Sequence, residues 1–249
     1  SKLGPRNRAI REPRVLHARS RSALLGTTSG ALGRAARRAM SKRGAFIVFE
    51  GVDRCGKTTQ STALVDALNA HDIRAELARF PDRTTQTGQI IDAYLKNNVE
   101  LDDRAIHLLF AANRWESASA IRDKLNAGTT LIVDRYAHSG VCFTSAKDGQ
   151  DMDWCMAPEQ GLPAPDAIFF LELSIDQAME RGGFGGERYE KEAFQRKVLA
   201  NFLSMKTDKW TVLDAARSRE ELAADIQKQA LQIISAAQEA PIGQLWQDA

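Results

Sequence analysis

The stretch Gly51-Val52-Asp53-Arg54-Cys55-Gly56-Lys57-Thr58 matches the pattern of Gly, four residues, Gly, Lys and then Ser or Thr. Its two glycines let the backbone curve around an anion, so that successive N–H groups point at phosphate oxygens. We expect Lys57 to reach the phosphates and the Thr58 hydroxyl to ligate Mg²⁺ at the start of the next helix. The flanks agree, with an apolar run before the loop and an amphipathic stretch after it. A Gly-rich turn that matches by chance is the less favoured interpretation.

Outward from this loop, short apolar runs alternate with longer amphipathic stretches. Strands separated by helices predict a parallel sheet with helices on both faces, and ligands bind such sheets at the carboxyl ends of the strands. The expected fold class is therefore α/β, a three-layer P-loop NTPase fold whose parallel five-stranded sheet is flanked by helices. The runs that predict strands are 45–50, 74–80, 130–134, 167–173 and 210–213, and the stretches that predict helices are 58–69, 85–96, 102–114, 117–127, 175–181, 188–205 and 218–238.

The composition of the 249 residues excludes several classes of protein. Hydrophobic residues make up 43% and charged residues 27%, which is ordinary for a globular chain. No run approaches the roughly 20 apolar residues that a membrane-spanning helix needs. The three cysteines form no CxxC pair, so a disulfide scaffold or a zinc ribbon is not expected. This cysteine usage predicts a reducing compartment, and we expect the folded core to be cytoplasmic or nuclear.

Charge divides the chain near residue 43. Residues 1–43 hold 12 Lys and Arg but one acid, a net charge of +11, whereas the remainder carries 22 basic and 31 acidic residues, or −9. The segment 1–43 is predicted to be an Arg-rich leader, disordered or targeting, and 44–249 to be the folded domain. Mitochondrial targeting, a basic tail that touches nucleic-acid phosphates, and an extension upstream of a start at Met40 all stay open.

Several observations narrow the kind of nucleotide protein. A GTPase should carry an Asn-Lys-x-Asp motif late in the chain, and the sequence has none. Motor ATPases usually need a larger core than the 206 residues that follow residue 43. Asp134 ends the apolar run 130–133, where a carboxylate can hold the water shell of a bound magnesium. A small kinase is the class that remains.

Five motifs occur in order along the folded part, and the first overlaps the phosphate loop. They are Phe49-Glu50-Gly51-Val52-Asp53-Arg54, Arg79-Phe80-Pro81, Ala112-Asn113-Arg114-Trp115-Glu116, Asp134-Arg135-Tyr136 and Gly185-Gly186-Glu187-Arg188-Tyr189-Glu190. With these motifs the sequence resembles the thymidylate kinases of the eukaryotic type, from about Arg43 to Leu245-Trp246. The resemblance implies a nucleoside monophosphate kinase that uses Mg²⁺ and transfers the γ-phosphoryl group of ATP to dTMP, giving dTDP.

The chemistry of such a transfer favours arginines over histidines. The acceptor is a phosphate monoester that is already ionised near pH 7, so catalysis is reduced to aligning two anions and neutralising the charge between them. The resemblance implies catalytic roles for Arg54, Lys57, Asp53 and Arg135, with Arg54 bridging donor and acceptor like an arginine finger. It implies ATP contacts from Gly51, Arg54, Cys55, Gly56, Lys57, Thr58, Thr59 and Arg181, and metal contacts from Thr58, Asp134 and Glu190.

The acceptor site implied by the resemblance contains Asp53, Phe80, Arg83, Phe110, Arg114, Arg135, Ser139, Phe143 and Tyr189. Arg83 and Arg135 would clamp the phosphate, since guanidinium forks match phosphate oxygens. Arg114 would read the carbonyl edge of thymine, and Tyr189 would crowd the 2′ position of the sugar. Core packing is the alternative for Phe80 and Phe110.

The glycine-rich segment near 181–189 predicts a lid that closes over ATP. The stretch 106–112 is apolar nearly all round a helix and must be covered on more than one face, which a fully buried core helix would explain. The resemblance favours a homodimer, because the family packs related helices across its dimer interface. Two rival functions stay open, a deoxynucleoside kinase acting on thymidine or a related nucleoside, and a nucleotide-dependent binding protein whose leader engages nucleic acid. ATP and dTMP are the expected partners, and nucleic acid is not expected as one.

Overall fold

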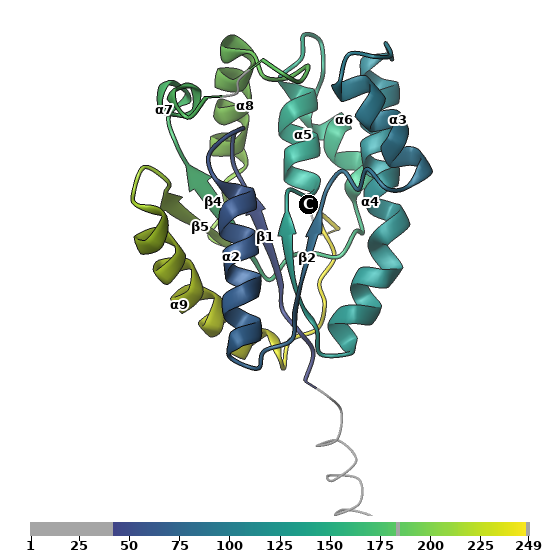
Figure 1. The fold of residues 1–249 in the computed structure, drawn as a ribbon. Coiled ribbons are helices and arrows are strands. Elements are labelled where there is room, and N and C mark those ends of the chain that lie inside the picture. The colour runs from purple at the N-terminus through teal and green to yellow at the C-terminus, as the bar shows by residue number, and fades with distance from the viewer. Residues whose placement is uncertain (1–41, 183–184, 248–249) are drawn as a thin grey trace, which may run out of the picture. The chain divides into compact units, whose positions relative to one another are not determined.

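The computed structural model describes residues 42–182 and 185–247. Five parallel strands form one sheet in the order β2-β3-β1-β4-β5 (Figure 1). The strands are β1 (Phe46–Glu50), β2 (Ala75–Arg79), β3 (Thr130–Asp134), β4 (Ala167–Glu172) and β5 (Trp210–Asp214). The helices are α2 (Lys57–Ala70), α3 (Gln86–Leu95), α4 (Asp103–Asn126), α5 (Ala137–Ser145), α6 (Met152–Met156), α7 (Ile175–Glu180), α8 (Glu192–Met205) and α9 (Arg219–Ala237), with a 3₁₀ turn η1 (Ala157–Glu159).

Helices cover both faces of the sheet, as expected for a parallel sheet (Figure 1). The side chains of β1 alternate between the two faces, so that Ile47 and Phe49 belong to one apolar cluster and Phe46 and Val48 to the other. The first cluster is completed by residues of α2, α7 and α9, and the second by residues of α4, α5 and α8. The predicted three-layer α/β fold class is therefore confirmed. None of the described helices is both long and apolar enough to cross a membrane.

All five predicted strands occur, but three helix predictions were wrong in detail. The stretches 102–114 and 117–127 form the single helix α4, since nothing between them breaks a helix. Helix α8 begins at Glu192 instead of residue 188. Helices α5 and α6 were missed, and α5 explains why: seven of its nine residues are buried, so it has no polar face and no amphipathic period.

The predicted leader, 1–43, lies outside the described residues except for its last two. Arg43 is buried, and its guanidinium donates to both carboxylate oxygens of Asp166 at 2.7 and 2.8 Å and to the carbonyl of Ala240 at 2.5 Å. Arg43 therefore belongs to the folded domain, which extends to the amino side of the predicted boundary at residue 43.

A buried histidine in α5 stays neutral. The ring of His138 packs edge-on against Trp210 and Trp246, with centroids 5.2 and 5.3 Å away, and its Nδ1 has no hydrogen-bond partner in the described part of the chain. Burial lowers the pKa of His138 to about 3, and the charge of Arg114 acts in the same direction. In the unfolded chain a histidine titrates near pH 6.5. The unfolded state therefore binds more protons below that pH, and the folded state loses stability as the pH falls.

We predict that His138→Phe, which keeps a ring between the two tryptophans, removes this pH dependence. Between pH 7 and 5 the wild type should lose about 2 kcal/mol through this one group, since the slope approaches 1.36 kcal/mol per pH unit below pH 6.5. Urea unfolding at pH 7 and pH 5 measures the loss for wild type and variant, with the exposed His71→Gln as the control. An equal loss in His138→Phe and in wild type would show that His138 does not titrate in this way.

Candidate active site

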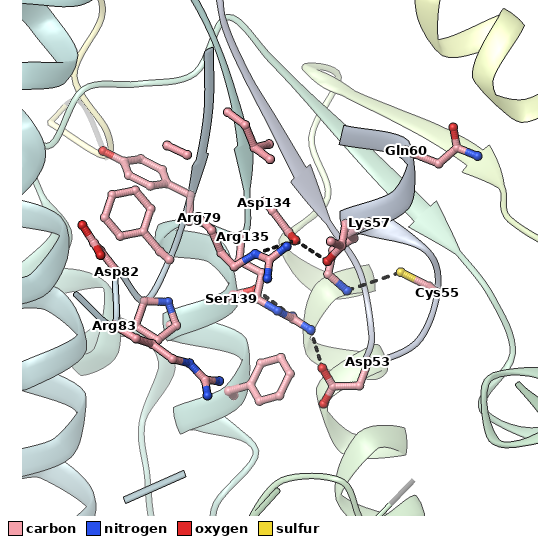
Figure 2. A pocket seen from close by; sticks show the side chains of 18 of the residues that line it. Asp53, Cys55, Lys57, Gln60, Arg79, Asp82, Arg83, Asp134, Arg135 and Ser139 are labelled. Carbon is pink, nitrogen blue, oxygen red and sulfur yellow. Dashed lines mark hydrogen bonds and ion pairs between the residues drawn. The ribbon is translucent and has the colours of Figure 1, made fainter. Parts of the chain in front are cut away.

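The carboxyl ends of the strands surround a cleft of about 1660 Å³. Figure 2 shows how acidic and basic side chains from three strand ends meet there. Every site residue named from the sequence lines this cleft except Gly51, whose backbone carbonyl accepts hydrogen bonds from Lys57 and Arg135. These are Asp53, Arg54, Cys55, Gly56, Lys57, Thr58, Thr59, Phe80, Arg83, Phe110, Arg114, Asp134, Arg135, Ser139, Phe143, Arg181, Tyr189 and Glu190.

The phosphate loop depends on glycine at two positions. Gly51 has a φ of 142°, and a Cβ there would lie 2.7 Å from the carbonyl oxygen of Leu171. Gly56 has a φ of 103° and directly precedes α2. Both values lie where L-residues are strained, which explains the glycines. The ammonium of Lys57 turns back into the loop and donates to the carbonyls of Val52 and Gly51, at 2.6 and 3.1 Å.

The register of the sheet brings together Thr58 and Asp134, two of the residues predicted to contact a magnesium ion. Phe49 of β1 stands opposite Asp134 of β3, so the loops that follow these strands are neighbours. The Thr58 hydroxyl donates to Asp134 Oδ2 at 2.6 Å. Arg79, at the end of β2, places its Nε 3.2 Å from the same oxygen. From the sequence, Arg79 was named only as part of the motif Arg79-Phe80-Pro81 and was given no role in the site, although its place at a strand end was a usable signal.

Arg135 crosses from β3 to the phosphate loop. Its guanidinium forms an ion pair with Asp53 and donates to the Gly51 carbonyl and to Ser139 Oγ, both at 3.3 Å. Its φ of 68° is left-handed, a strained conformation for an arginine that is typical of functional sites. Burial opposes the charged form, but the carboxylates of Asp53, Asp134 and Glu50 outweigh it and raise the pKa of Arg135.

Glu50, at the end of β1, is a fully buried carboxylate that sequence reasoning did not assign to the site. One oxygen accepts from the backbone N–H groups of Tyr136 and Ser139 at 2.9 and 3.0 Å, and the other from the Ser139 hydroxyl at 2.6 Å. Burial raises the pKa of Glu50, and these donors and the charge of Arg135 counteract part of that rise. Glu50 thereby fixes the turn that carries Arg135.

Two acids from the segment after residue 184 hold two of the predicted phosphate-binding arginines. Arg54, with a left-handed φ of 65°, pairs with Glu190 Oε1 at 3.0 Å. Arg83 donates to both oxygens of Glu187 at 2.8 and 3.2 Å and to Asp92 at 2.6 Å. A phosphate would be held by an arginine in the same two-pronged way.

Glu190, predicted from the sequence to contact the metal, uses both carboxylate oxygens within the chain in this structure. Its Oε2 accepts from the backbone N–H groups of Gly185, Gly186 and Glu187 at 3.0, 2.8 and 3.2 Å, while Oε1 is paired with Arg54. Both oxygens therefore organise the chain around them.

Arg181, a predicted ATP contact, is held by the backbone. Its guanidinium donates to the carbonyls of Cys55 and Ala215, at 3.1 and 2.5 Å.

The buried side-chain amide of Gln195, which was not predicted from the sequence, links Asp53 and Tyr189, the two residues predicted to contact the sugar. Gln195 Nε2 donates to Asp53 Oδ2 at 2.6 Å and to the Tyr189 carbonyl at 3.0 Å, and its Oε1 accepts from the Asp53 N–H at 3.1 Å. The Tyr189 ring stacks on Phe194 with centroids 5.1 Å apart. Gln195 had no motif around it, so only the fold could show its position.

The aromatic side of the cleft is partly core. Phe80 is buried and packs on Tyr136 at 5.5 Å between centroids, whereas Phe110 and Phe143 are half-buried. Arg114 is nearly fully buried and forms a two-pronged ion pair with Glu159, which has no exposed surface. Glu159 was not predicted, because no pattern in the sequence connects it with Arg114.

A cleft of this composition, with a phosphate loop at one end and a second arginine cluster at the other, can bind two phosphorylated molecules. The family profile described as "Thymidylate kinase" matches residues 49–226. The chain belongs to the thymidylate kinase family. It is therefore a nucleoside monophosphate kinase, as the motifs predicted.

Relatives and a solved structure of the thymidylate kinase family agree with this membership. The thymidylate kinase of Danio rerio is 51% identical over 208 residues, which are 82% of this chain and 98% of that protein. That of Homo sapiens is 48% identical over 209 residues, 83% and 99% of the two chains. The solved thymidylate kinase of Candida albicans, described as having broad substrate specificity, superposes with a TM-score of 0.74 at 35% identity and covers 81% of this chain and 98% of its own.

We predict that Glu50→Ala destabilises this thymidylate kinase fold by about 2–5 kcal/mol, because it leaves buried donors unsatisfied and opens a cavity. The matched control is Glu172→Ala at the exposed carboxyl end of β4. Urea unfolding measures the free energy of unfolding for each. A loss below 1 kcal/mol for Glu50→Ala, or one no larger than in the control, would show that Glu50 does not fix the turn.

Proposed function

We propose that the chain transfers the γ-phosphoryl group of ATP to dTMP, giving dTDP. The observation that carries this proposal is the set of cations Arg54, Lys57, Arg83 and Arg135 along one cleft that, in the described part of the chain, is lined by no histidine. An acceptor that is already ionised needs no general base, and a cleft of arginines serves to align two anions.

The donor end consists of the phosphate loop and Arg181. The loop N–H groups and Lys57 would hold the β- and γ-phosphates. Arg54 would move from Glu190 to the phosphoryl group in transfer, where it neutralises charge on the equatorial oxygens. The catalytic roles of Arg54, Lys57, Asp53 and Arg135 are part of this proposal.

A magnesium ion fits beside the donor. Thr58 and Asp134 offer a hydroxyl and a carboxylate whose oxygens lie 2.6 Å apart, and Mg²⁺ is usually held by one or two such oxygens together with phosphates. The described residues contain no group of three or more His, Cys, Asp or Glu that could form a protein-only cage. When bound, the ion would neutralise charge on the phosphates.

The acceptor would lie between the arginines and the aromatic wall. Arg83 and Arg135 would hold its phosphate, which requires Glu187 to give up Arg83. Asp53 would accept from the 3′-hydroxyl of the sugar, and Tyr189 would exclude a 2′-hydroxyl. Arg114 would donate to the thymine carbonyl, with Phe80, Phe110, Phe143 and Ser139 as the surroundings of the base.

We also propose a homodimer and a lid. Leu108 and Trp115 of α4 are 48% and 42% exposed, and a second copy would cover such an apolar face. The lid, at about 181–189, includes residues 183–184, which are not described, so this proposal rests on the glycines and acids of 185–190. For the Arg-rich leader, targeting stays a prediction from its composition.

A coupled assay with ATP and Mg²⁺ across the nucleoside monophosphates tests the proposed function. We expect dTMP to give the highest kcat/KM, because Arg114 and Tyr189 recognise base and sugar together. Thymidine is the control acceptor, since it has no phosphate for Arg83 and Arg135. Equal turnover of dTMP, UMP and AMP, or a preference for thymidine, would contradict the proposal.

We predict that Arg54→Gly lowers kcat roughly 10³-fold, the lower end of what arginine fingers contribute, because Lys57 remains. Glycine tolerates the left-handed φ of this position, so the loop backbone should keep its shape. Asp72→Gly makes the same change at another left-handed residue, outside the cleft, and is the control. Since the lost contact forms only in the transition state, kcat and kcat/KM should fall together. A rise in the KM for ATP with an unchanged kcat would show that Arg54 only binds.

A further inference from the structure

The guanidinium of Arg114 uses two of its three nitrogens for one carboxylate. Its Nε donates to Glu159 Oε2 at 2.8 Å, and its Nη2 donates to Glu159 Oε1. Both hydrogen bonds that Arg114 makes among the described residues thus go to one carboxylate. Nη1 is the nitrogen that remains, and Arg114 lines the cleft.

Gly140 of α5 provides the space in which this guanidinium lies. A Cβ at Gly140 would be 2.4 Å from Arg114 Nη2 and 3.0 Å from Arg114 Cζ. Glycine is unfavourable inside a helix by about 1 kcal/mol relative to alanine, so its presence in a nine-residue helix calls for a reason of this kind. Three elements, α4, α5 and η1, therefore fix the orientation of one side chain.

The turn that carries Glu159 is attached to α4 independently of Arg114. Trp115 Nε1 donates to the Pro158 carbonyl at 2.8 Å, and Arg122 Nη2 donates to the Gly161 carbonyl at 2.9 Å. The turn therefore has anchors of its own. Trp115 and Arg122 therefore share any structural role that Glu159 has in holding the turn. They do not share a role in orienting Arg114.

We propose that Glu159 is a positioning residue that sets the choice of acceptor base, by turning Arg114 so that only the N–H donors of Nη1 meet the base. This inference rests on the proposed function and adds to it the residue that makes Arg114 selective. A guanidinium has donors and no acceptor. It can satisfy the carbonyl at position 4 of thymine or uracil, but it faces the amino group of cytosine donor to donor.

Kinetics of Glu159→Gln with dTMP and dCMP test the proposal, alongside a thermal melt of each protein. The amide of glutamine turns a donor toward the guanidinium, so Arg114 should rotate. We expect the KM for dTMP to rise about tenfold with kcat changed less than twofold, and the ratio of kcat/KM for dTMP over dCMP to fall about tenfold. Trp115→Phe, which loosens the same turn and leaves the ion pair intact, should keep that ratio within twofold of wild type.

The outcomes separate the inference from the function beneath it. Wild-type protein that turns over dCMP as well as dTMP would overturn the proposed function itself. A selective wild type whose dTMP over dCMP ratio survives Glu159→Gln, or falls equally in Trp115→Phe, would overturn the inference alone. Gly140→Ala displaces the guanidinium without removing the carboxylate. It should lower the same ratio, and it decides the question if Glu159→Gln does not fold; an unchanged ratio there would equally overturn the inference.

Discussion

Arginines gathered in one cleft repel one another, and the structure pairs three of those proposed to meet phosphates with carboxylates of the same chain. Arg135 is paired with Asp53, Arg54 with Glu190 and Arg83 with Glu187. These three cations are thereby held in place. Under the proposed function, a bound phosphate would replace Glu190 or Glu187 instead of ordering a free side chain. Since exposed ion pairs contribute little stability, the exposed pair of Arg83 and Glu187 could be exchanged for a phosphate at small cost. The partly buried pair of Arg135 and Asp53 is the more permanent one.

The parallel sheet makes this arrangement possible. Because β1 and β3 are neighbours, the phosphate loop and the turn that carries Arg135 leave the sheet side by side. Glu50 then connects them, from the last residue of β1 to the first turn of α5. A carboxylate without exposed surface is costly, which its raised pKa reflects, and its three donors are what make it tolerable. We infer that the fold accepts this cost to fix the position of Arg135.

The sequence was sufficient for the fold class, the strands and the phosphate loop, because these depend on local pattern and on glycines that have a steric reason. It also named eighteen of the residues that line the cleft, through the phosphate loop and the motifs that resemble the family. It could not find the residues that hold those side chains. Glu159 lies 45 positions from Arg114, and Gln195 lies 142 positions from Asp53, so only the tertiary structure joins them. Helix α5 was not predicted for a different reason, since a helix buried on nearly all sides has no amphipathic period.

The central claim is that the chain's own carboxylates hold the cations which later meet the phosphates. Crystal structures of the protein without nucleotide, and with ADP, dTMP, Mg²⁺ and aluminium fluoride as a mimic of the transferring phosphoryl group, test it most directly. The account predicts that Arg54 pairs with Glu190 in the first structure and contacts the fluoride in the second, while Arg83 exchanges Glu187 for the phosphate of dTMP. If both arginines kept their carboxylate partners in the transition-state complex, the account would be contradicted.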